Sequence, residues 1–294
     1  MRIRLFIIAL GTATLVFLVL CFGPKAHLWG PSAQIISTHV EQSILNAAWA
    51  PADTTTTQGP VIACTINHHL LAANLIAQTL RPITQNVQTI LLVSPDHFTH
   101  SRSYLTTTAA RWATADGLVE APDALIRTLR TLGVSEDQSP FPEEHGIGNV
   151  LPFLHRVFPK AKIAPLLVRT NYPVADAVRF GQQLVSKLPP NTLIVGSFDF
   201  SHNHTLAEAN MHDTESLRAI AAHNYNTFSA LDVDSPAGLA LVTAAAEQLG
   251  ATTFDIVTHS NSAQLTQILD AQETTSYLNG YFHSPPNWYT LPNF

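Results

Sequence analysis

Histidine and aspartate side chains follow four short apolar segments of the sequence, at the point where each segment ends. In chain order, the residues at these ends are His68 and His69, Asp96 and His97, Asp199 and His202, and His259. Imidazole and carboxylate are ligands that zinc, iron, copper and nickel accept in proteins. One histidine at a strand end is typically structural, whereas four such ends favour a shared site. The pattern therefore predicts a metal site, provided that the four segments are neighbouring strands.

The apolar segments alternate with stretches that have the 3.6-residue periodicity of helices. The predicted strands are 61–66, 89–94, 162–168, 192–197, 252–258 and 276–282. The predicted helices are 70–80, 122–132, 147–158, 174–188, 214–224 and 236–249. Continuous apolar strands that are separated by helices of this length predict an α/β fold with a mainly parallel sheet covered on both faces. Ligands of such sheets bind at the carboxyl ends of the strands, where the histidines lie.

Two other interpretations of these residues stay open. A hydrogen-bonded network of histidine and aspartate would need no ion. A serine nucleophile is the second alternative because Ser94, Ser197 and Ser201 lie beside the same strand ends, although the sequence has no Gly-x-Ser-x-Gly turn. The glycine patterns of phosphate and dinucleotide sites are absent as well. A net charge of −6 and the lack of a Lys/Arg run argue against nucleic acid as a partner.

Two acidic residues and a histidine precede the predicted helix at 147–158. Glu143 and Glu144 suit a helix N-terminus for electrostatic reasons alone. In the functional interpretation, His145 points into the same edge of the sheet as a general acid or base, or as a substrate contact. Among the histidines that follow Asp199, His204 is the candidate to hydrogen-bond a metal ligand without binding the metal itself.

The first 23 residues have the pattern of a membrane segment. Arg2 and Arg4 precede an uncharged apolar run from residue 5 to about residue 23, and its length is close to the ~20 residues that cross a bilayer. We interpret this run as an uncleaved transmembrane anchor, with the arginines inside and the following chain on the extracytoplasmic side. A cleaved signal peptide is the alternative.

The remaining chain divides into a short connecting region and one large domain. Residues 24–60 are predicted to contain a short helix at 34–49 and a Pro/Thr-rich linker at 51–60. Residues 61–294 are long enough for a single α/β domain with a substantial core. The two cysteines of the sequence do not make a disulfide framework.

Five stretches, in their order along the chain, resemble the Memo family and in particular the bacterial proteins called AmmeMemoRadiSam system protein B. They include Ile-Leu-Leu-Val-Ser-Pro-Asp-His at 90–97, Glu-His-Gly-Ile-Gly-Asn at 144–149 and Gly-Ser-Phe-Asp-Phe-Ser-His at 196–202, together with 61–73 and 259–263. Each stretch is short, and their joint order carries the resemblance. Family members are similar in fold to class III extradiol dioxygenases, which implies a three-layer α/β/α sandwich with a metal pocket above the sheet.

The resemblance implies a set of site residues. His68 and His97 match the first two metal ligands of the family. Asp199 and His202 match an Asp-x-x-His pair that lines the same pocket, and His145 matches a Glu-His segment.

The sequence also departs from the family pattern. Asn67 stands where the family has proline, so that either His68 or His69 is the ligand. Gly146 stands where the family has serine, and a carboxylate two residues later is missing.

A further departure concerns a thiol ligand. Animal members place a cysteine near the position of Leu265, and the sequence has none there. We expect His259 to take its place as a ligand.

The N-terminal segment and the resemblance together predict an extracytoplasmic metalloprotein of this family that binds a divalent metal, first of all Fe(II), with copper and zinc as alternatives. A dioxygenase-like or other redox activity would use His145 or His202 to move a proton. The competing functions are a zinc-dependent hydrolase of an amide or ester, and a binding module that holds a metal or peptide without turnover. The expected substrate is a small molecule or peptide, and the family implies a functional link to a radical-SAM protein.

Overall fold

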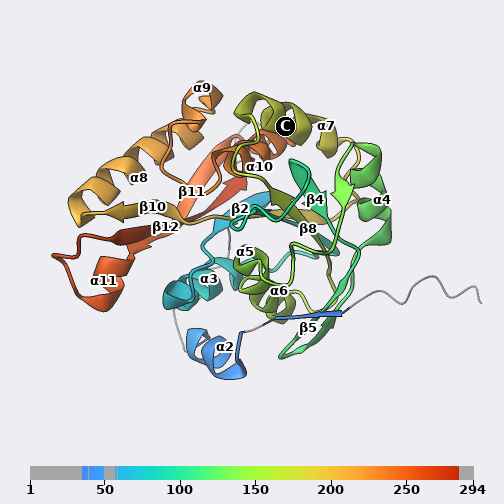
Figure 1. The fold of residues 1–294 in the computed structure, drawn as a ribbon, viewed down its shortest axis with the longest axis horizontal. Coiled ribbons are helices and arrows are strands. Elements are labelled where there is room, and N and C mark those ends of the chain that lie inside the picture. Colours follow the sequence, from blue (N-terminus) through green and yellow to red (C-terminus); the bar gives the residue numbers. More distant parts are fainter. Residues whose placement is uncertain (1–34, 39, 50–56, 58, 285–294) are drawn as a thin grey trace, which may run out of the picture. The chain divides into compact units, whose positions relative to one another are not determined.

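A nine-stranded mixed sheet is the centre of the part of the chain that the structure describes. The computed structural model describes residues 35–38, 40–49, 57 and 59–284, which lie in one compact unit that begins at Ile35. Helices pack on both faces of this sheet (Figure 1). The predicted α/β class with a mainly parallel sheet is confirmed.

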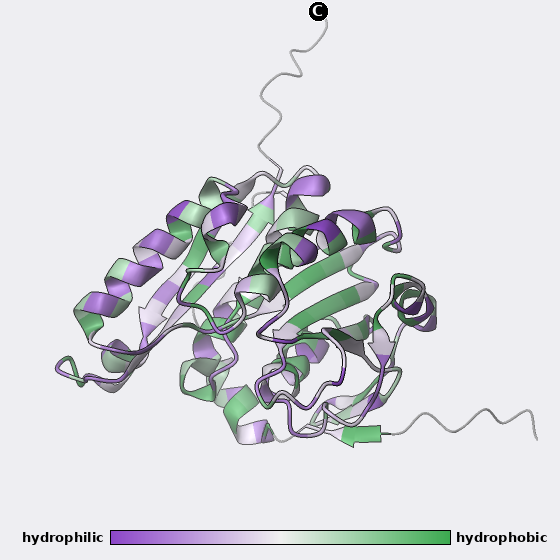
Figure 2. Cartoon of the chain, turned by 45° about the horizontal axis from the view of Figure 1, so that its top comes forward, coloured by the Kyte–Doolittle hydropathy of each residue, from purple (hydrophilic) through white to green (hydrophobic). Residues whose placement is uncertain are grey.

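Four parallel strands form the middle of the sheet. In spatial order they are β2 (Ala63–Ile66), β9 (Thr192–Ser197), β3 (Thr89–Pro95) and β8 (Lys162–Val168). Almost all of their residues are buried, because helices cover both faces and leave no polar side of the sheet. Figure 2 shows the hydrophobic strands in the interior of the domain. The sequence predicts β8 and β9 with the bounds that the structure has.

Antiparallel and short strands flank the parallel centre. On one side, β12 (Thr274–His283) pairs with β2, and both β10 (Phe200–His204) and β11 (Thr253–Asn261) pair with β12. On the other side, β4 (Leu105–Thr107) pairs with β8, and β7 (Ser135–Glu136) pairs with β4. The strands β4, β7 and β10 have no long apolar run, which explains why the sequence pattern did not predict them.

Two groups of helices cover the sheet, and each has its own hydrophobic core. The first core contains residues of α4 (Asp123–Thr131), α7 (Val174–Val185), α8 (Leu206–Ala221), α9 (Tyr225–Phe228) and α10 (Pro236–Gln248). The second contains residues of α2 (Gln42–Ala48), α3 (Ala73–Leu80), α5 (His145–Gly148) and α6 (Leu151–Val157). The short helices η1 (Leu70–Ala72) and α11 (Ser262–Thr266) contribute to a small cluster around Tyr277.

Residues upstream of the predicted domain boundary belong to the fold. The strand β1 (Ile35–Ser37) pairs with β5 (Arg111–Thr114), and β6 (Gly117–Val119) completes a separate three-stranded sheet. Ile36 and Leu45 are buried in the second core. The helix predicted at 34–49 is wrong in its first part, because the β-branched Ile35–Ser37 segment finds a distant strand as its partner.

The predicted membrane segment at 1–23 lies outside the described residues, and so does most of the predicted linker at 51–60. Within the described ranges, no helix has both the length and the apolar character that a bilayer crossing requires.

Candidate metal centre

Three histidines converge at the carboxyl edge of the parallel strands. His68 follows β2, His97 follows β3, and His145 is the first residue of α5. One ring nitrogen of each lies within 4.8 Å of the others. The ring centroids are 4.8 Å apart for His68 and His97, 5.2 Å for His68 and His145, and 4.0 Å for His97 and His145. The strands β2 and β3 both flank β9 in parallel, so their ends necessarily meet at one edge.

A carboxylate fixes the ring of His97. The Nδ1 atom of His97 lies 2.6 Å from Glu144 Oε1, and the His97 backbone amide donates to Glu144 Oε2 over 3.0 Å. Nδ1 therefore carries a proton, and Nε2 is left as the atom that faces the other histidines. Burial opposes the charged ring, but the carboxylates of Asp234 and Glu144 outweigh it and raise the pKa of His97 to about 10.

The same glutamate also begins helix α5. Glu144 is buried, and its Oε1 accepts a hydrogen bond from the Gly146 amide at 3.0 Å. The two interpretations of this acidic residue from the sequence are thus compatible, because one carboxylate both caps the helix and orients His97.

The tautomer of His68 follows from its hydrogen bonds. Ser197 Oγ donates its single proton to the Gly146 carbonyl at 2.7 Å, so that it accepts from His68 Nδ1 at 3.1 Å. Nε2 of His68 is then unprotonated and available to a metal. Burial, followed by the charges of the neighbouring histidines, holds the pKa of His68 well below its ordinary value, which favours this neutral ligand form.

Two aspartate side chains that are only 5% and 8% exposed, Asp199 and Asp234, lie near Nε2 of His68. Its Nε2 lies 3.6 Å from Asp199 Oδ2 and 3.4 Å from Asp234 Oδ2. Burial and the neighbouring Asp234 carboxylate raise the pKa of Asp199 to about 8, and burial raises that of Asp234. Among the described residues, the buried Oδ1 atom of Asp234 has no hydrogen-bond partner. Oδ2 of Asp234 lies 3.4 Å from His68 Nε2 and 3.7 Å from His97 Nε2, so a carboxylate stands beside the imidazoles, and these donors together fit a divalent metal.

Asp234 was not among the residues that the sequence predicts for the site. It lies in the turn before α10, in the sequence Leu-Asp-Val-Asp-Ser-Pro at 231–236, and follows no predicted strand. Its carboxylate accepts from the Asp199 amide at 2.9 Å, and its own amide donates to the Asp199 carbonyl at 3.1 Å. The paired aspartates of this turn are the only signal in the sequence that points to it.

Two other predicted histidines lie near the cluster but are not members of it. His69 is exposed, and its Nδ1 lies 2.8 Å from the Tyr277 hydroxyl. Of the adjacent pair His68 and His69, the structure thus brings His68 into the cluster. His202 is half-buried and near enough for its charge to lower the pKa of His68, after burial and other histidines.

The structure places His259 at a different carboxylate. Its Nε2 lies 2.8 Å from Oδ2 of the buried Asp213 in α8, whose Oδ1 accepts from Ser201 Oγ and Ser276 Oγ at 2.9 and 2.5 Å. His259 lies on β11, which is paired antiparallel with β12 at the edge of the sheet. The expectation that it replaces the missing cysteine therefore gains no support from its contacts.

Comparison with known proteins defines the relationship of this chain. A family model described as Memo-like protein matches residues 38–281. The chain belongs to the Memo family. A MEMO1 family protein of Nitrosopumilus maritimus is 23% identical over 208 residues, which cover 67% of this chain and 73% of the relative. A MEMO1 family protein of Methanopyrus kandleri is 27% identical over 141 residues, which cover 46% of this chain and 50% of the relative.

One solved structure supports the fold of this Memo-family chain. The crystal structure of the uncharacterized protein JW3007 from Escherichia coli K12 aligns with a TM-score of 0.50 and 15% sequence identity. The alignment covers 74% of this chain and 98% of that chain. At this identity the likeness concerns the fold alone.

The glycine that departs from the Memo pattern has a local explanation. A Cβ atom built at Gly146 would overlap the hydroxyl of Ser94 and would lie 3.1 Å from Cε1 of His97. Ser94, on β3, therefore occupies the space that a serine at position 146 would need. Gly146 donates its amide to Glu144, so the glycine still takes part in the cap at the start of α5.

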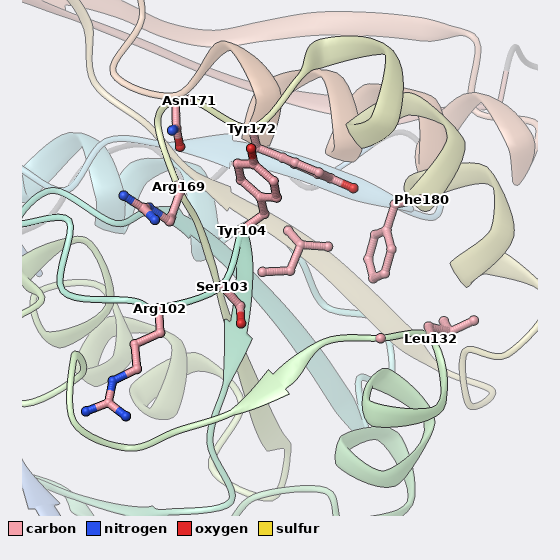
Figure 3. Close-up of a pocket in the computed structure, with 10 residues that line it drawn as sticks. Arg102, Ser103, Tyr104, Leu132, Arg169, Asn171, Tyr172 and Phe180 are labelled. Atoms are coloured by element: carbon pink, nitrogen blue, oxygen red, sulfur yellow. The ribbon is translucent and has the colours of Figure 1, made fainter.

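A separate cavity of about 540 Å³ lies beyond the end of β8 (Figure 3). Arg169 directly follows β8, and Tyr104 and Tyr172 have ring centroids 5.3 Å apart. The residues that line the cavity are Arg102, Ser103, Tyr104, Leu105, Leu132, Gly133, Arg169, Asn171, Tyr172 and Phe180. None of the histidines of the cluster contributes to it, so the cavity and the candidate metal centre are distinct features.

Proposed function

We propose that this Memo-family protein is a metalloprotein in which His68, His97 and His145 hold one divalent cation. The observation that carries the proposal is the convergence of three imidazole nitrogens within 4.8 Å, with the tautomer of His68 fixed by Ser197 and the ring of His97 held by Glu144. His97, protonated in the metal-free protein, would release its Nε2 proton when a metal binds. Fe(II) is the proposed ion, because it accepts imidazole nitrogen together with the carboxylate oxygen that the neighbouring aspartates offer.

A dioxygenase-like or other redox reaction is the activity that we propose for this site. Bound Fe(II) would supply open positions for O₂ and a substrate oxygen. Burial and the charge of His97 lower the pKa of His145, which favours the neutral form that a ligand needs, and its 42% exposed side chain leaves the ion accessible to a substrate. Asp199, with its pKa raised to about 8, is suited to donate a proton, and His202 lies nearby as a second carrier.

A zinc-dependent hydrolase is the competing function. Three histidine nitrogens are also a ligand set of catalytic zinc, which activates a water molecule for attack on a carbonyl. With the three rings as ligands, the proton of that water molecule would pass to Asp199 or His202.

Elemental analysis of the anaerobically purified full-length protein tests the proposal. We expect about one equivalent of iron in the wild type and none in a His68→Ala/His97→Ala variant. The matched control is His69→Ala, which removes the adjacent imidazole and is expected to keep the metal. Wild-type iron content in the double variant would disprove the site, whereas zinc that is present in the wild type and lost from the double variant would favour the hydrolase. Metal without turnover of any tested substrate would favour a binding module.

We also propose that residues 1–23 anchor the protein in the membrane, with the α/β domain on the extracytoplasmic side. The support is the order of Arg2 and Arg4 before an uncharged apolar run. Alkaline phosphatase fused after Phe294 is expected to be active, because that enzyme needs an oxidising compartment to form its disulfides. An inactive alkaline phosphatase fusion, together with activity of a reporter enzyme that works only in the cytoplasm and is fused at the same position, would contradict this topology.

A further inference from the structure

A second group of metal-binding side chains lies apart from the three-histidine cluster. His204 Nε2 lies 2.8 Å from Asp232 Oδ2, and His212 Nδ1 lies 2.9 Å from the same oxygen. The two rings are perpendicular, with centroids 4.5 Å apart. One ligand atom from each of the three residues lies within 4.8 Å of the others. Neither the family relationship nor the sequence pattern assigns a function to this group.

The three residues come from separate segments that the fold holds together. His204 is the last residue of β10, His212 lies in the first half of α8, and Asp232 precedes α10. The Ser201 amide donates to the Asp232 carbonyl at 2.9 Å, and Phe200 forms an isolated antiparallel bridge with Val233. The position of the carboxylate relative to His204 is therefore fixed by the backbone and not by the side-chain contact alone.

The geometry needs only a small adjustment to accept an ion. In a tetrahedral site with bond lengths of about 2.0–2.1 Å, ligand atoms are roughly 3.3 Å apart. The observed N···O distances of 2.8 and 2.9 Å would have to open by about 0.5 Å, which side-chain torsions can provide. The side chains are 27–31% exposed, so solvent or a further ligand can reach the open positions.

A second imidazole distinguishes this group from the other His–Asp pairs of the protein. His283 Nε2 lies 2.6 Å from Asp255 Oδ2, and His259 pairs with Asp213. In the described part of the chain, neither of these pairs belongs to a group of three metal-binding residues. An ordinary ion pair has one imidazole beside one carboxylate oxygen. Here two imidazoles lie beside the same oxygen, so that three donor atoms are close enough to bind one ion.

We propose that His204, His212 and Asp232 form a second binding site for a first-row divalent cation of the zinc and copper class. Two imidazole nitrogens and one carboxylate oxygen form a donor set that binds zinc and copper more tightly than magnesium or calcium, which bind oxygen ligands. The nearby Glu208, one helical turn before His212, adds negative charge. Its pKa is lowered first by the Thr205 hydroxyl and amide that donate to it, and further by His204 and His212.

The second site would act on the segment that supports the three-histidine cluster. Asp232 is two residues from Asp234, and the intervening Val233 is buried in the first hydrophobic core. An ion on Asp232 would hold the turn at 231–236 against β10 and so restrain Asp234 beside His68. We therefore assign a positioning role to the second ion, and no part in the chemistry of the first site.

Equilibrium dialysis of the full-length protein against Zn²⁺, after removal of bound metal with a chelator, tests this proposal. The wild type is expected to bind two equivalents, and a His204→Asn/His212→Asn variant one. The matched control is His283→Asn, which removes one imidazole from a His–Asp pair and is expected to bind two. A His68→Ala/His97→Ala variant is expected to keep one equivalent at the second site.

The outcomes separate the two sites. Wild-type stoichiometry in the His204→Asn/His212→Asn variant would overturn the second site and leave the first untouched. Loss of zinc in this variant but not in the His68→Ala/His97→Ala variant would support the second site and contradict the first. If the His204→Asn/His212→Asn variant does not fold, Asp232→Asn replaces it, because this change keeps the volume of the side chain. Asp232→Asn is expected to bind one zinc equivalent fewer than the wild type, and two bound equivalents would also overturn the proposal.

Discussion

The two histidine clusters share the residue types and differ in almost everything around them. In the three-histidine cluster, two rings have a partner on the nitrogen that points away from the others, Glu144 for His97 and Ser197 for His68. In the second cluster, both rings use Asp232 itself as their partner. The first cluster also has two buried aspartates with raised pKa values. Supporting groups, and not the ligands alone, are therefore the difference between the cluster for which we propose an activity and the one that we propose only to hold an ion.

Removal of one ligand from each cluster gives the largest expected contrast. His68→Ala is expected to weaken Fe(II) binding at the first site at least about 1000-fold, since it removes a buried ligand and the imidazole that faces both Asp199 and Asp234. His204→Ala is expected to leave that binding within a few-fold of wild type. Anaerobic titration with Fe(II) measures both. Equal losses in the two variants would show that the clusters are not separate sites.

The next largest effect is expected from the carboxylate behind His97. Glu144→Gln keeps the shape of the side chain and the acceptor for the Gly146 amide, but weakens the hold on the His97 tautomer. Such substitutions cost about 10–100-fold in metal affinity. The same titration measures the change, and Glu143→Gln, at an exposed neighbouring position, is the matched control. An unchanged affinity in Glu144→Gln would limit this residue to its role at the start of α5.

The buried charges of the first cluster predict a pH dependence of stability in the chelator-treated protein. Asp199 has a pKa raised from 3.8 to about 8, and His97 from 6.5 to about 10. At these two groups the folded state binds more protons than the unfolded state, so their contribution to the free energy of unfolding falls as the pH rises from about 4 to 10. The lowered pKa values of His68 and His145 act in the opposite direction below about pH 6.5. Asp199→Asn is expected to flatten the part between pH 4 and 8.

Urea unfolding at several pH values measures this dependence, with the exposed Asp270→Asn as the control. A wild-type slope between pH 4 and 8 in Asp199→Asn would show that other groups cause the fall. His204→Asn, in the second cluster, is a further control and is expected to leave this slope unchanged.

The smallest effect is expected from the histidine beside the first ligand. His69→Ala removes an exposed ring that contacts Tyr277, so metal affinity should stay within about twofold of wild type. This variant is the direct test of which member of the His68 and His69 pair binds the metal. A loss similar to that of His68→Ala would mean that the backbone at this position reorganises when a metal binds.

Sequence patterns predicted the framework of the site well, and its supporting groups less well. The parallel strands β3, β8 and β9 are long apolar runs, so local composition alone locates them and the histidines that follow. Asp234 was missed because it reaches the cluster through a backbone bridge between residues far apart in sequence. The position of His259 depends on the antiparallel pairing of β11 with β12, which no local pattern contains.

The close packing of Ser94 and Gly146 limits the order in which these two positions can change in evolution. The two positions share one small volume between β3 and α5, so a side chain at 146 requires the Ser94 hydroxyl to rotate out of it. An exchange to glycine at 94 and serine at 146 is then easier through a variant with glycine at both positions. The reverse order passes through two serines that crowd His97. A combinatorial library selected for iron binding should accordingly be depleted in pairs with a side chain at both positions.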